Sequence, residues 1–515
     1  MRLCDSYGHS DERNTKIIAL YFNAVMRIRF SLLFVLVANA LYAQTTTRFS
    51  SGYSAEIGAF ASSTKRMPFW LRANQYGIVP LTAPVGTVRL GAHGEWNADS
   101  TGKSNRWFAR YGVYAAGNVA QKSQFVLPEL YAMTGFGKFY ISAGRRREVI
   151  GLGDSTYSSG FYSWSQNATP ITKVQIGTNG FVPLKFTKSL VAFNFTYAHG
   201  WFPNSDSVHN SFLHQKTLFF RFGKPKWKVK FYGGIVHNVQ WGGGSDYLKQ
   251  SLTMNGNFPS SFRDYIDLVV ARPPRNRPAN YTGIDSNNQI GNHLGSLDFG
   301  TELMIERWNL LVYYQHPFED RSGLAFTNTT DGLYGIRLKN TAVRTNNGFR
   351  MNQLTLEYLN TTGANRVPEN LVDRYEPDNY FNHSQYIDGW TTRQRVIGTP
   401  FITRWQDVRS EYAIPLNRVR RMIINNTVKM AHVAFAGAFG SGMQVETRLS
   451  FSQNYGPFIN PVYKDKHVNQ FSGILRTVIP VSWLGQSEVQ AAVSLDSGQL
   501  FYNAVGGYLG IRKTW

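Results

Sequence analysis

The stretch Thr217–Val236, which reads TLFFRFGKPKWKVKFYGGIV, decides the fold. Successive side chains of an extended strand point to opposite faces, so each half of this stretch has two walls. In the second half an apolar wall is formed by Trp227, Val229, Phe231 and Ile235, while Lys228 and Lys230 lie on the other. Glycine and proline in Gly223–Lys226 predict a short turn between the halves. A hairpin with one apolar and one cationic wall suits a sheet that separates lipid from water.

The same alternation recurs in Leu297–Ile305, Leu354–Tyr358 and Val445–Phe451. In each stretch apolar residues hold one phase and charged residues enter the other, as Asp298 and Glu302 do. Charged inward side chains argue against a packed sandwich core and for a polar lumen. We therefore predict an all-β fold, a transmembrane antiparallel β-barrel. Its short turns, including Gly223–Lys226, should lie on the periplasmic side.

Composition agrees with a barrel. The chain is 43% hydrophobic and 15% aromatic, yet its mean hydropathy is -0.29, which does not suit a helical membrane protein. At roughly 25 residues for each strand with its share of loops, residues 44–515 give on the order of 16–20 strands. A large soluble all-β protein is the alternative that composition alone would favour.

The N-terminal segment predicts export. A basic stretch, Met26–Arg29, precedes the apolar run Phe30–Ala38, and Leu41–Ala43 offers a cleavage site. Residues 26–43 are therefore interpreted as a signal peptide. The polar residues 1–25 are interpreted as a mis-assigned start or an extension, and residues 44–515 as one outer-membrane barrel domain.

Charge and cysteine usage limit the partners. The only cysteine, Cys4, precedes the signal, so the exported chain would have neither disulfides nor thiol catalysis. The formal charge of the whole chain is +22, of which about +20 remains after residue 43. Such a balance favours an acidic partner. Export makes lipopolysaccharide or an acidic polysaccharide a better candidate than nucleic acid.

Two long polar intervals, Gly242–Arg277 and Asn360–Arg404, are expected to form outer loops or to fold into the lumen. In the first, Ser260 could cap a short helix whose apolar face holds Phe262, Tyr265, Ile266 and Val269. Residues 45–110 look less strand-like at their start and could lie partly in the periplasm or plug the pore.

Sugar binding needs flat apolar rings and, for acidic sugars, arginine, which can meet a carboxylate with two hydrogen bonds. The long loops supply both types of residue, and the cluster from Asp378 to Arg395 is the strongest candidate. The predicted ligand-binding residues are Tyr380, Tyr386, Trp390, Arg393, Arg395, Trp241 and Arg275. For any single aromatic residue, a place in an interfacial girdle or in loop packing is the competing interpretation.

No motif predicts catalysis, a metal or a cofactor. His209 and His214 have neither zinc-protease spacing nor an intervening Glu, and the adjacent carboxylates Glu319 and Asp320 suit a loop role better than glycosidase chemistry. Arg145–Arg147 could guide an acidic polymer, but ion pairing with inward acids such as Asp298 or Glu302 is the favoured interpretation.

Several phrases in order resemble the Wzi-type capsule-assembly family of outer-membrane proteins, in its Bacteroidetes-like branch. They include Met67–Gly77, Ser158–Gly160 with Asn167–Pro170, Tyr313–His316 with Asp331–Ile336, Asp378–Asn382, and Ile397–Pro400. The resemblance implies a monomeric barrel of about 18 strands, closed by short helical and loop elements. It also implies a lectin-like, non-enzymatic role in holding capsular polysaccharide at the cell surface.

Three other functions remain open. A porin-like channel for anionic solutes would need an open lumen. An outer-membrane barrel hydrolase would need a close pair of catalytic groups. A soluble periplasmic all-β protein would need no detergent.

Overall fold

The computed structural model describes residues 48–98, 106–205, 207–248, 251–273, 282, 285, 289–319, 321–342, 348–363, 378–412, 422–457, 467–482 and 485–515. The predicted signal peptide, the segment before it, and Arg275 lie outside these residues. No helix in the described part of the chain is both long and apolar enough to cross a membrane.

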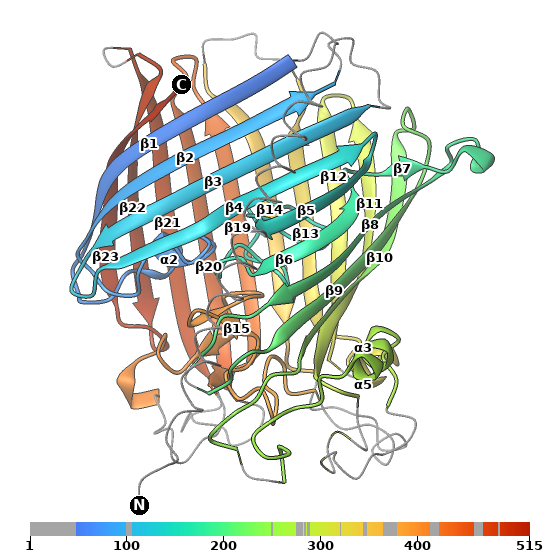
Figure 1. Ribbon diagram of the computed structural model, residues 1–515. Helices are drawn as coiled ribbons and strands as arrows, with labels where there is room; N and C mark the ends of the chain where they lie inside the picture. The colour runs from blue at the N-terminus through green and yellow to red at the C-terminus, as the bar shows by residue number, and fades with distance from the viewer. Residues whose placement is uncertain are drawn as a thin grey trace, which may run out of the picture.

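Eighteen antiparallel strands form one closed ring (Figure 1). In chain order they are β1 (Arg48–Ser62), β2 (Val85–Asn97), β3 (Trp107–Val119), β4 (Gln124–Phe136), β5 (Phe139–Arg145), β6 (Thr172–Thr178), β8 (Val191–Trp201), β9 (Phe212–Phe222), β10 (Val229–Trp241), β11 (Asn292–Ile305), β12 (Trp308–Phe318), β13 (Gly332–Asn340), β14 (Arg350–Asn360), β19 (Thr427–Ala438), β20 (Gln444–Gly456), β21 (Val468–Val481), β22 (Ser487–Gly498) and β23 (Ala504–Thr514). A two-residue strand, β7 (Val182–Pro183), pairs antiparallel with the start of β8, with Val182 opposite Phe193. Pairing of β1 with β23, from Ser54 opposite Thr514 onward, closes the ring and confirms the predicted barrel.

The hairpin at Thr217–Val236 becomes β9 and β10, with Phe222 opposite Phe231. Its apolar wall faces outward, since Phe231 is 55% exposed. Lys230 faces the lumen and pairs with Glu302 of β11 at 2.6 Å. Lys228 precedes β10 and is exposed in the connection. Both walls of the predicted hairpin therefore have the expected orientation along β10.

The two ends of the barrel differ in their connections. At one end the turns are short, such as 137–138, 223–228 and 306–307. The other end carries the intervals 63–84, 146–171, 242–291 and 361–426. Outer-membrane barrels keep short turns on the periplasmic side. We therefore call the short-turn end periplasmic and the other end extracellular.

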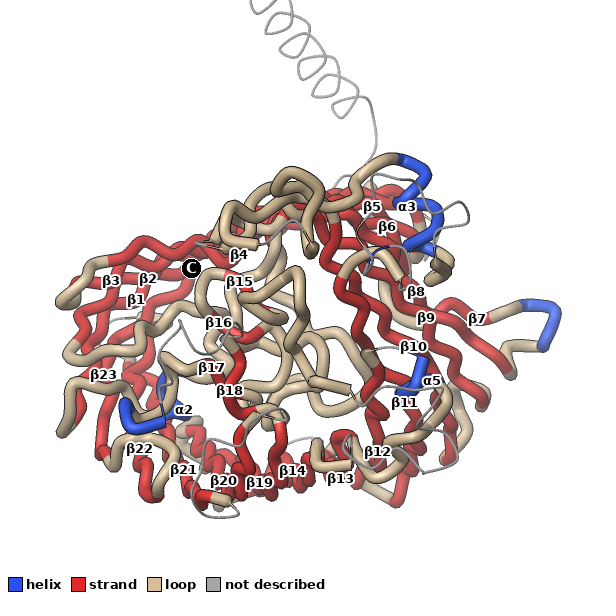
Figure 2. Tube along the Cα trace, turned by 90° about the horizontal axis from the view of Figure 1, so that it is seen from below, coloured by secondary structure: helices blue, strands red, loops and turns tan. Residues whose placement is uncertain are grey.

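The extracellular mouth contains a plug, which we define as residues 63–84, 146–171 and the described residues between 378 and 426. It includes α2 (Phe69–Arg72), β15 (Thr391–Thr392), β16 (Arg395–Val396), η3 (Ser410–Tyr412), and the pair β17 (Thr403–Arg404) and β18 (Ile423–Asn425). Figure 2, viewed from the extracellular end, shows β15 to β18 within the ring of strands. Residues 45–110 were expected to be less strand-like at their start, whereas residues 48–62 form the first barrel strand. Residues 63–84 do enter the plug, which is one of the two places expected for this region.

Three short helical elements lie beyond the plug: η1 (Lys185–Thr187), α3 (Phe262–Val269) and α5 (Arg321–Leu324). The helix predicted after residue 260 is α3, but its cap is Ser261 and not Ser260. The Ser261 hydroxyl accepts from the Asp264 amide, and the Asp264 carboxylate accepts from the Ser261 amide. This reciprocal capping box satisfies two amides that helix geometry leaves free.

Candidate functional site

The plug is packed against the inner wall of the barrel. Phe69 of α2 lies 5.0 Å from the ring of Phe401 and 5.4 Å from that of Phe501. Its backbone amide donates to the Asp496 carboxylate of β22 at 2.8 Å. Inward residues of β9, β10 and β11, namely Leu213, Val236 and Leu294, belong to the same apolar cluster as plug residues that are far from them in sequence. The plug is thus a second core inside the lumen, and its contacts with Gln353 and Arg448 reach past the middle of the barrel from the extracellular end.

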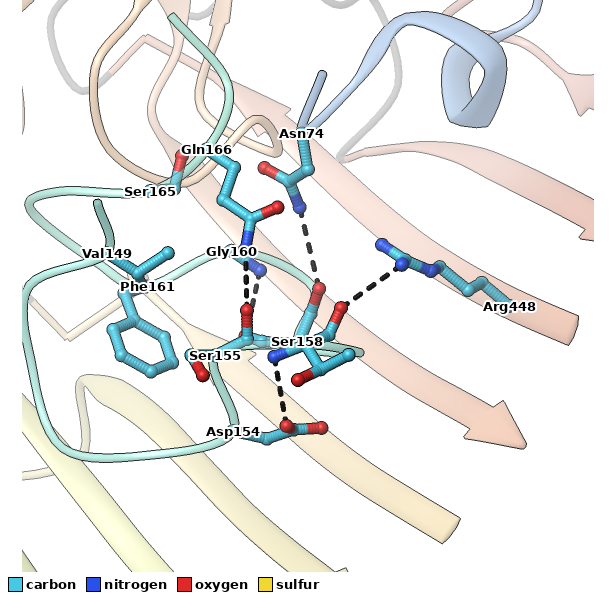
Figure 3. A pocket seen from close by; sticks show the side chains of 11 residues that line it. Asn74, Val149, Asp154, Ser155, Ser158, Gly160, Phe161, Ser165, Gln166 and Arg448 are labelled. Atoms are coloured by element: carbon cyan, nitrogen blue, oxygen red, sulfur yellow. Dashed lines mark hydrogen bonds between the residues drawn. The ribbon is translucent and has the colours of Figure 1, made fainter. Parts of the chain in front are cut away.

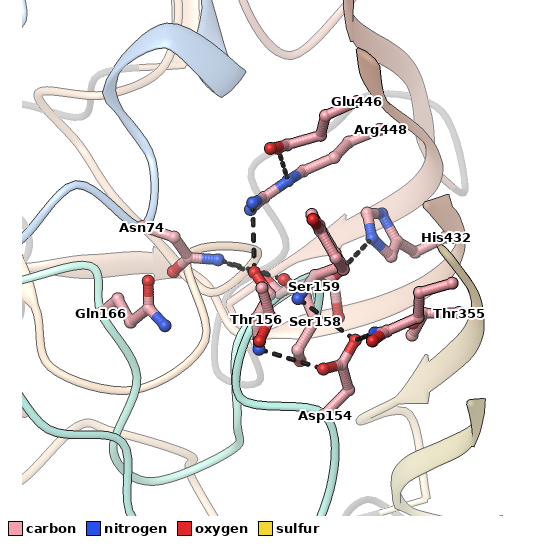
Figure 4. A network of polar contacts seen from close by, with 12 residues as sticks. Asn74, Asp154, Thr156, Ser158, Ser159, Gln166, Thr355, His432, Glu446 and Arg448 are labelled. Carbon is pink, nitrogen blue, oxygen red and sulfur yellow. Dashed lines mark hydrogen bonds and ion pairs between the residues drawn. The ribbon is translucent and has the colours of Figure 1, made fainter. Parts of the chain in front are cut away.

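A polar network at the centre of the plug is organised by Asp154, which is 2% exposed (Figure 4). Its carboxylate accepts from the Thr355 hydroxyl and the Gln353 amide of β14, both at 2.6 Å. The backbone amides of Thr156 and Tyr157 also donate to it, at 3.0 and 3.1 Å. Four donors replace the water that a buried carboxylate loses. The two donors from β14 also fix the segment 146–171 to the wall.

Arg448 of β20, which is separated from β14 by β19 alone, completes this network. Its guanidinium pairs with Glu446 at 2.8 Å and donates to the Thr156 carbonyl at 3.2 Å. Its charge lies 5.6 Å from the centre of the Trp70 ring, within the range of a cation–π contact. His432 Nε2 lies 3.0 Å from the Tyr157 carbonyl. Two strands therefore hold the same plug segment.

A small cavity lies beside this network (Figure 3). Its volume is about 10 Å³, room for about one water molecule, and it is lined by Asn74, Val149, Asp154, Ser155, Thr156, Ser158, Gly160, Phe161, Ser165, Gln166 and Arg448. Two of its amide groups already donate to the backbone: Gln166 to the Ser155 carbonyl at 2.6 Å and Asn74 to the Ser159 carbonyl at 3.1 Å. Ordinary ligand pockets enclose about 300–1,000 Å³. The cavity suits immobilisation of the plug better than binding of a polymer.

The predicted binding aromatics Tyr380 and Trp390 lie inside the plug and are 1% and 0% exposed. The Tyr380 hydroxyl donates to Asp331 at 2.7 Å and accepts from Asn328 at 2.6 Å. The Trp390 indole donates to the Ser163 carbonyl at 2.7 Å. Their rings have no free face for a sugar in this conformation. The interval folds into the lumen, one of the two expected arrangements, and these two aromatics have the competing role of loop packing.

Two further members of the predicted cluster are also held internally. The Tyr386 hydroxyl donates to the Gly242 carbonyl at 3.2 Å, and its ring packs on Phe258. Arg395 donates to the Val79 carbonyl at 2.8 Å and lies 4.0 Å from Asp407. Arg393, in the turn between β15 and β16, is exposed. Among the predicted binding residues of the cluster, it is the exposed one.

Trp241 lies elsewhere, at the extracellular end of β10 on the outer wall. Only 5% of it is exposed, because Tyr265 of α3 covers it with ring centres 5.2 Å apart. This packing against a helix differs from the predicted sugar contact. Arg275, on the same interval, lies outside the described residues.

A group that the sequence did not predict lies at the extracellular rim, and we call Arg66, Arg409, Ser410 and Tyr502 the rim cluster. The guanidinium carbons of Arg66 and Arg409 lie 5.8 and 6.0 Å from the centre of the Tyr502 ring. The Tyr502 hydroxyl donates to the Ser410 hydroxyl at 3.0 Å and accepts from the Ser410 amide. Hydrogen bonding with Ser410 lowers the pKa of Tyr502. The cluster joins a ring and two cations, the types that acidic sugars need, and Tyr502 and the two arginines are partly exposed.

The run Arg145–Arg147 forms ion pairs, as favoured, but with different acids. Arg146 pairs with Glu148 at 2.6 Å, and Arg147 pairs with Glu129. Lys173 also pairs with Glu148. The predicted partners are engaged elsewhere: the Asp298 carboxylate accepts from the Leu152 amide, and Glu302 pairs with Lys230. Burial opposes ionisation of Glu148, but Lys173 and Arg146 outweigh it and lower its pKa to about 2.

Histidines that are scattered in sequence gather on the outer wall. His199, His214, His237 and His293 occupy four consecutive strands from β8 to β11. His237 Nε2 lies 3.0 Å from His293 Nδ1. The spacing of these histidines in the sequence does not show that they lie together. The pairing register of the four strands does. In the described part of the chain no set of three or more His, Cys, Asp or Glu side chains is placed to hold a metal.

Eighteen strands closed into a ring, an apolar exterior and unequal ends define a β-barrel with the architecture of bacterial outer-membrane proteins. In sequence, neither a protein-family model nor a curated protein matches the chain.

In structure the chain is similar to Wzi, described as an outer-membrane protein involved in group 1 capsule assembly in Escherichia coli and a carbohydrate-binding β-barrel. The TM-score is 0.55 at 14% identity, covering 89% of this chain and 83% of Wzi. OccAB2 of Acinetobacter baumannii has a TM-score of 0.45 at 8% identity, covering 91% of this chain and 98% of OccAB2. OccK5 of Pseudomonas aeruginosa has a TM-score of 0.44 at 6% identity, with 90% and 97% covered. The likeness to Wzi shows the fold, while membership of the Wzi-type family stays a prediction.

Proposed function

We propose that this protein is a lectin-like barrel of the outer membrane that binds an acidic surface polysaccharide and supports capsule assembly or attachment. It works as a monomer and without catalysis. The observation that carries the proposal is the rim cluster, in which the guanidinium carbons of two arginines lie 5.8 and 6.0 Å from the centre of one tyrosine ring at the extracellular end.

The chemistry of the rim cluster fits such a polymer. The Tyr502 ring offers a flat surface to the C–H face of a pyranose, and Arg66 and Arg409 offer donors to a sugar carboxylate. Exposed Arg393 supplies another cation at the mouth. A single contact of this kind is weak. A polymer that meets several of them is retained, because each further contact becomes intramolecular.

Two further observations support the proposal. The plug packs inside the lumen against the barrel wall, which suits surface binding better than passage through the barrel. The sequence phrases that resemble the Wzi-type family and the structural similarity to Wzi point in the same direction.

The test is binding of the purified protein to polygalacturonate, with neutral dextran as the comparison polymer. Tyr502→Ala and Arg66→Gln should each weaken polygalacturonate binding several-fold. Tyr247→Ala is the matched control, because Tyr247 is a 72% exposed tyrosine on a different extracellular interval. Unchanged binding by both rim variants would overturn the assignment of the site. In cells, deletion of the gene should move polysaccharide from the cell-bound to the released fraction.

A channel for anionic solutes is the second candidate, favoured by charges on the inner wall in the periplasmic half. There Arg110 pairs with Glu95 at 2.9 Å and Lys230 with Glu302 at 2.6 Å. Conductance in planar lipid bilayers separates the two functions. Large, stable, anion-selective pores would favour the channel.

A further inference from the structure

The outer wall from β8 to β11 changes character along its length. Towards the periplasm its outward residues are apolar and exposed, as are Phe222, Phe231 and Phe299. Towards the extracellular end the same outward phase carries polar side chains: His199, His214, Lys216, His237 and His293. Acyl chains cannot hydrogen-bond such groups, so direct exposure to lipid would be costly.

The helix α3 covers much of this polar patch from outside the barrel. The Tyr265 hydroxyl lies 2.9 Å from that of Tyr197 and 3.3 Å from His214 Nδ1. The Lys216 ammonium donates to the Val269 carbonyl at the end of the helix. Leu268 is fully buried and belongs to the same cluster as Trp241. The helix thus supplies partners that lipid cannot. Figures 1 and 2 show α3 on the outside of the ring of strands.

The opposite face of α3 is apolar and uncovered. Phe262, Ile266 and Val270 are 78%, 44% and 56% exposed. Their spacing of four residues places them in one row along the helix. The β12–β13 connection repeats the arrangement, since Phe326 stacks on outward His316 with ring centres 4.5 Å apart and is itself 42% exposed. At both places a loop covers polar wall residues and presents new apolar ones.

We infer that α3 is an interfacial helix that lies in the outer leaflet of the membrane, with Phe262, Ile266 and Val270 in contact with acyl chains. The row continues the apolar outer surface of β8 to β11, which is the reason to assign lipid and not a protein partner. Exposed Arg263, one residue from Phe262, is placed to meet lipid phosphates at the headgroup level. Trp241, which was predicted to bind ligand, instead packs against α3, and α3 anchors the barrel in the membrane. The inference rests on the membrane location in the proposed function, and is independent of polysaccharide binding.

Spin labels test this placement directly. Cys4 is the only cysteine, so Cys4→Ser gives a cysteine-free chain into which Ile266→Cys or Val270→Cys can be introduced. The labelled proteins are reconstituted in phosphatidylcholine–phosphatidylglycerol vesicles, and collision with oxygen is compared with collision with a water-soluble nickel chelate. Phe231→Cys gives the lipid reference and Tyr247→Cys the aqueous one.

Labels at positions 266 and 270 should resemble the label at 231, with high oxygen and low nickel accessibility. Labels there that resemble the one at 247 would overturn the inference, whether the helix faces water or a soluble partner. Asp267→Asn removes the ion pair between buried Asp267 and Arg272. It is measured beside the labelled proteins to show how the labels respond when α3 itself is weakened. Polygalacturonate binding by each labelled protein is measured in parallel. Lost lipid contact with retained binding would reject the anchor alone, and lost binding with retained lipid contact would reject the polysaccharide site alone.

Discussion

Trp390 donates its indole N–H to the carbonyl of Ser163 at 2.7 Å, although the two residues are 227 positions apart in the chain. Both are buried, with 0% and 1% exposure. The bond joins the segment 146–171 to the segment that begins at residue 378. Ring contacts of Trp390 with Trp164 and Phe202 surround it. The plug is therefore one packed unit, and not a set of independent loops.

Trp390→Phe should destabilise the plug without leaving a large cavity in it. The phenyl ring keeps most of the apolar contact, but the Ser163 carbonyl loses its donor in a buried place. Leaving such a group unsatisfied costs about 1–3 kcal/mol. We expect faster proteolysis of the plug segments in detergent and an unchanged β-sheet signal in circular dichroism. Trp227→Phe, at a half-exposed position in the periplasmic turn 223–228, is the matched control and should behave as the parent. Equal proteolysis of the two variants would show that the bond does not hold the plug.

The barrel could be predicted from sequence because its rule is local. Phe231 and Lys230 alternate along one strand, and alternation needs no knowledge of the partner strand. The number of strands could be estimated from the length of the chain, because each strand with its share of loops uses roughly 25 residues. Burial then confirmed both walls, with Phe231 outside and Lys230 paired inside.

The candidate site could not be predicted in the same way. A loop tryptophan that binds a sugar and one that packs a plug have the same composition around them, so Trp390 gave no local sign of burial. Tyr502 and Arg66 meet only because the ring closes β23 onto β1, which no spacing along the chain reports. The four outer histidines likewise depend on register.

Glycines that face aromatic rings inside the barrel should not tolerate a side chain. A Cβ on Gly335 of β13 would lie 2.1 Å from the Tyr313 ring, whose hydroxyl donates to Glu357 at 2.5 Å. Gly335→Ala must move that ring, and such overpacking costs about 1–3 kcal/mol. Urea unfolding in lipid vesicles, followed by tryptophan fluorescence, measures the change.

The control for that substitution is Gly233→Ala on β10. A Cβ there would have no heavy atom within 4 Å among the described residues. Its effect should stay within about 0.5 kcal/mol. Equal losses in the two variants would point to backbone freedom of glycine, and not to the ring, as the cause.

Polymer binding at the rim cluster should weaken as salt rises. The arginines are partly exposed, and at about 1 M ionic strength the screening length falls to about 3 Å. Polygalacturonate binding by the parent is therefore expected to fall between low and high salt, whereas Arg66→Gln should show a shallower dependence. Surface plasmon resonance across a salt series measures both slopes. Parallel slopes would mean that Arg66 does not contact the polymer.

Stability in acid should depend on Glu148. Its pKa in the folded protein is about 2, against an ordinary value of 4.5, so the folded state binds its proton less readily than the unfolded state. The resulting stabilisation is present above pH 4.5 and is lost as the pH falls towards 2. A shift of this size corresponds to at most about 3 kcal/mol.

Glu148→Gln should lack this part of the pH dependence and be less stable at neutral pH, because Lys173 then stays buried without its anion. Thermal unfolding in detergent between pH 7 and pH 2.5 follows both effects. Glu411→Gln, which changes an exposed carboxylate on the plug, should match the parent throughout. A parent-like acid profile for Glu148→Gln would place the acid sensitivity elsewhere in the barrel.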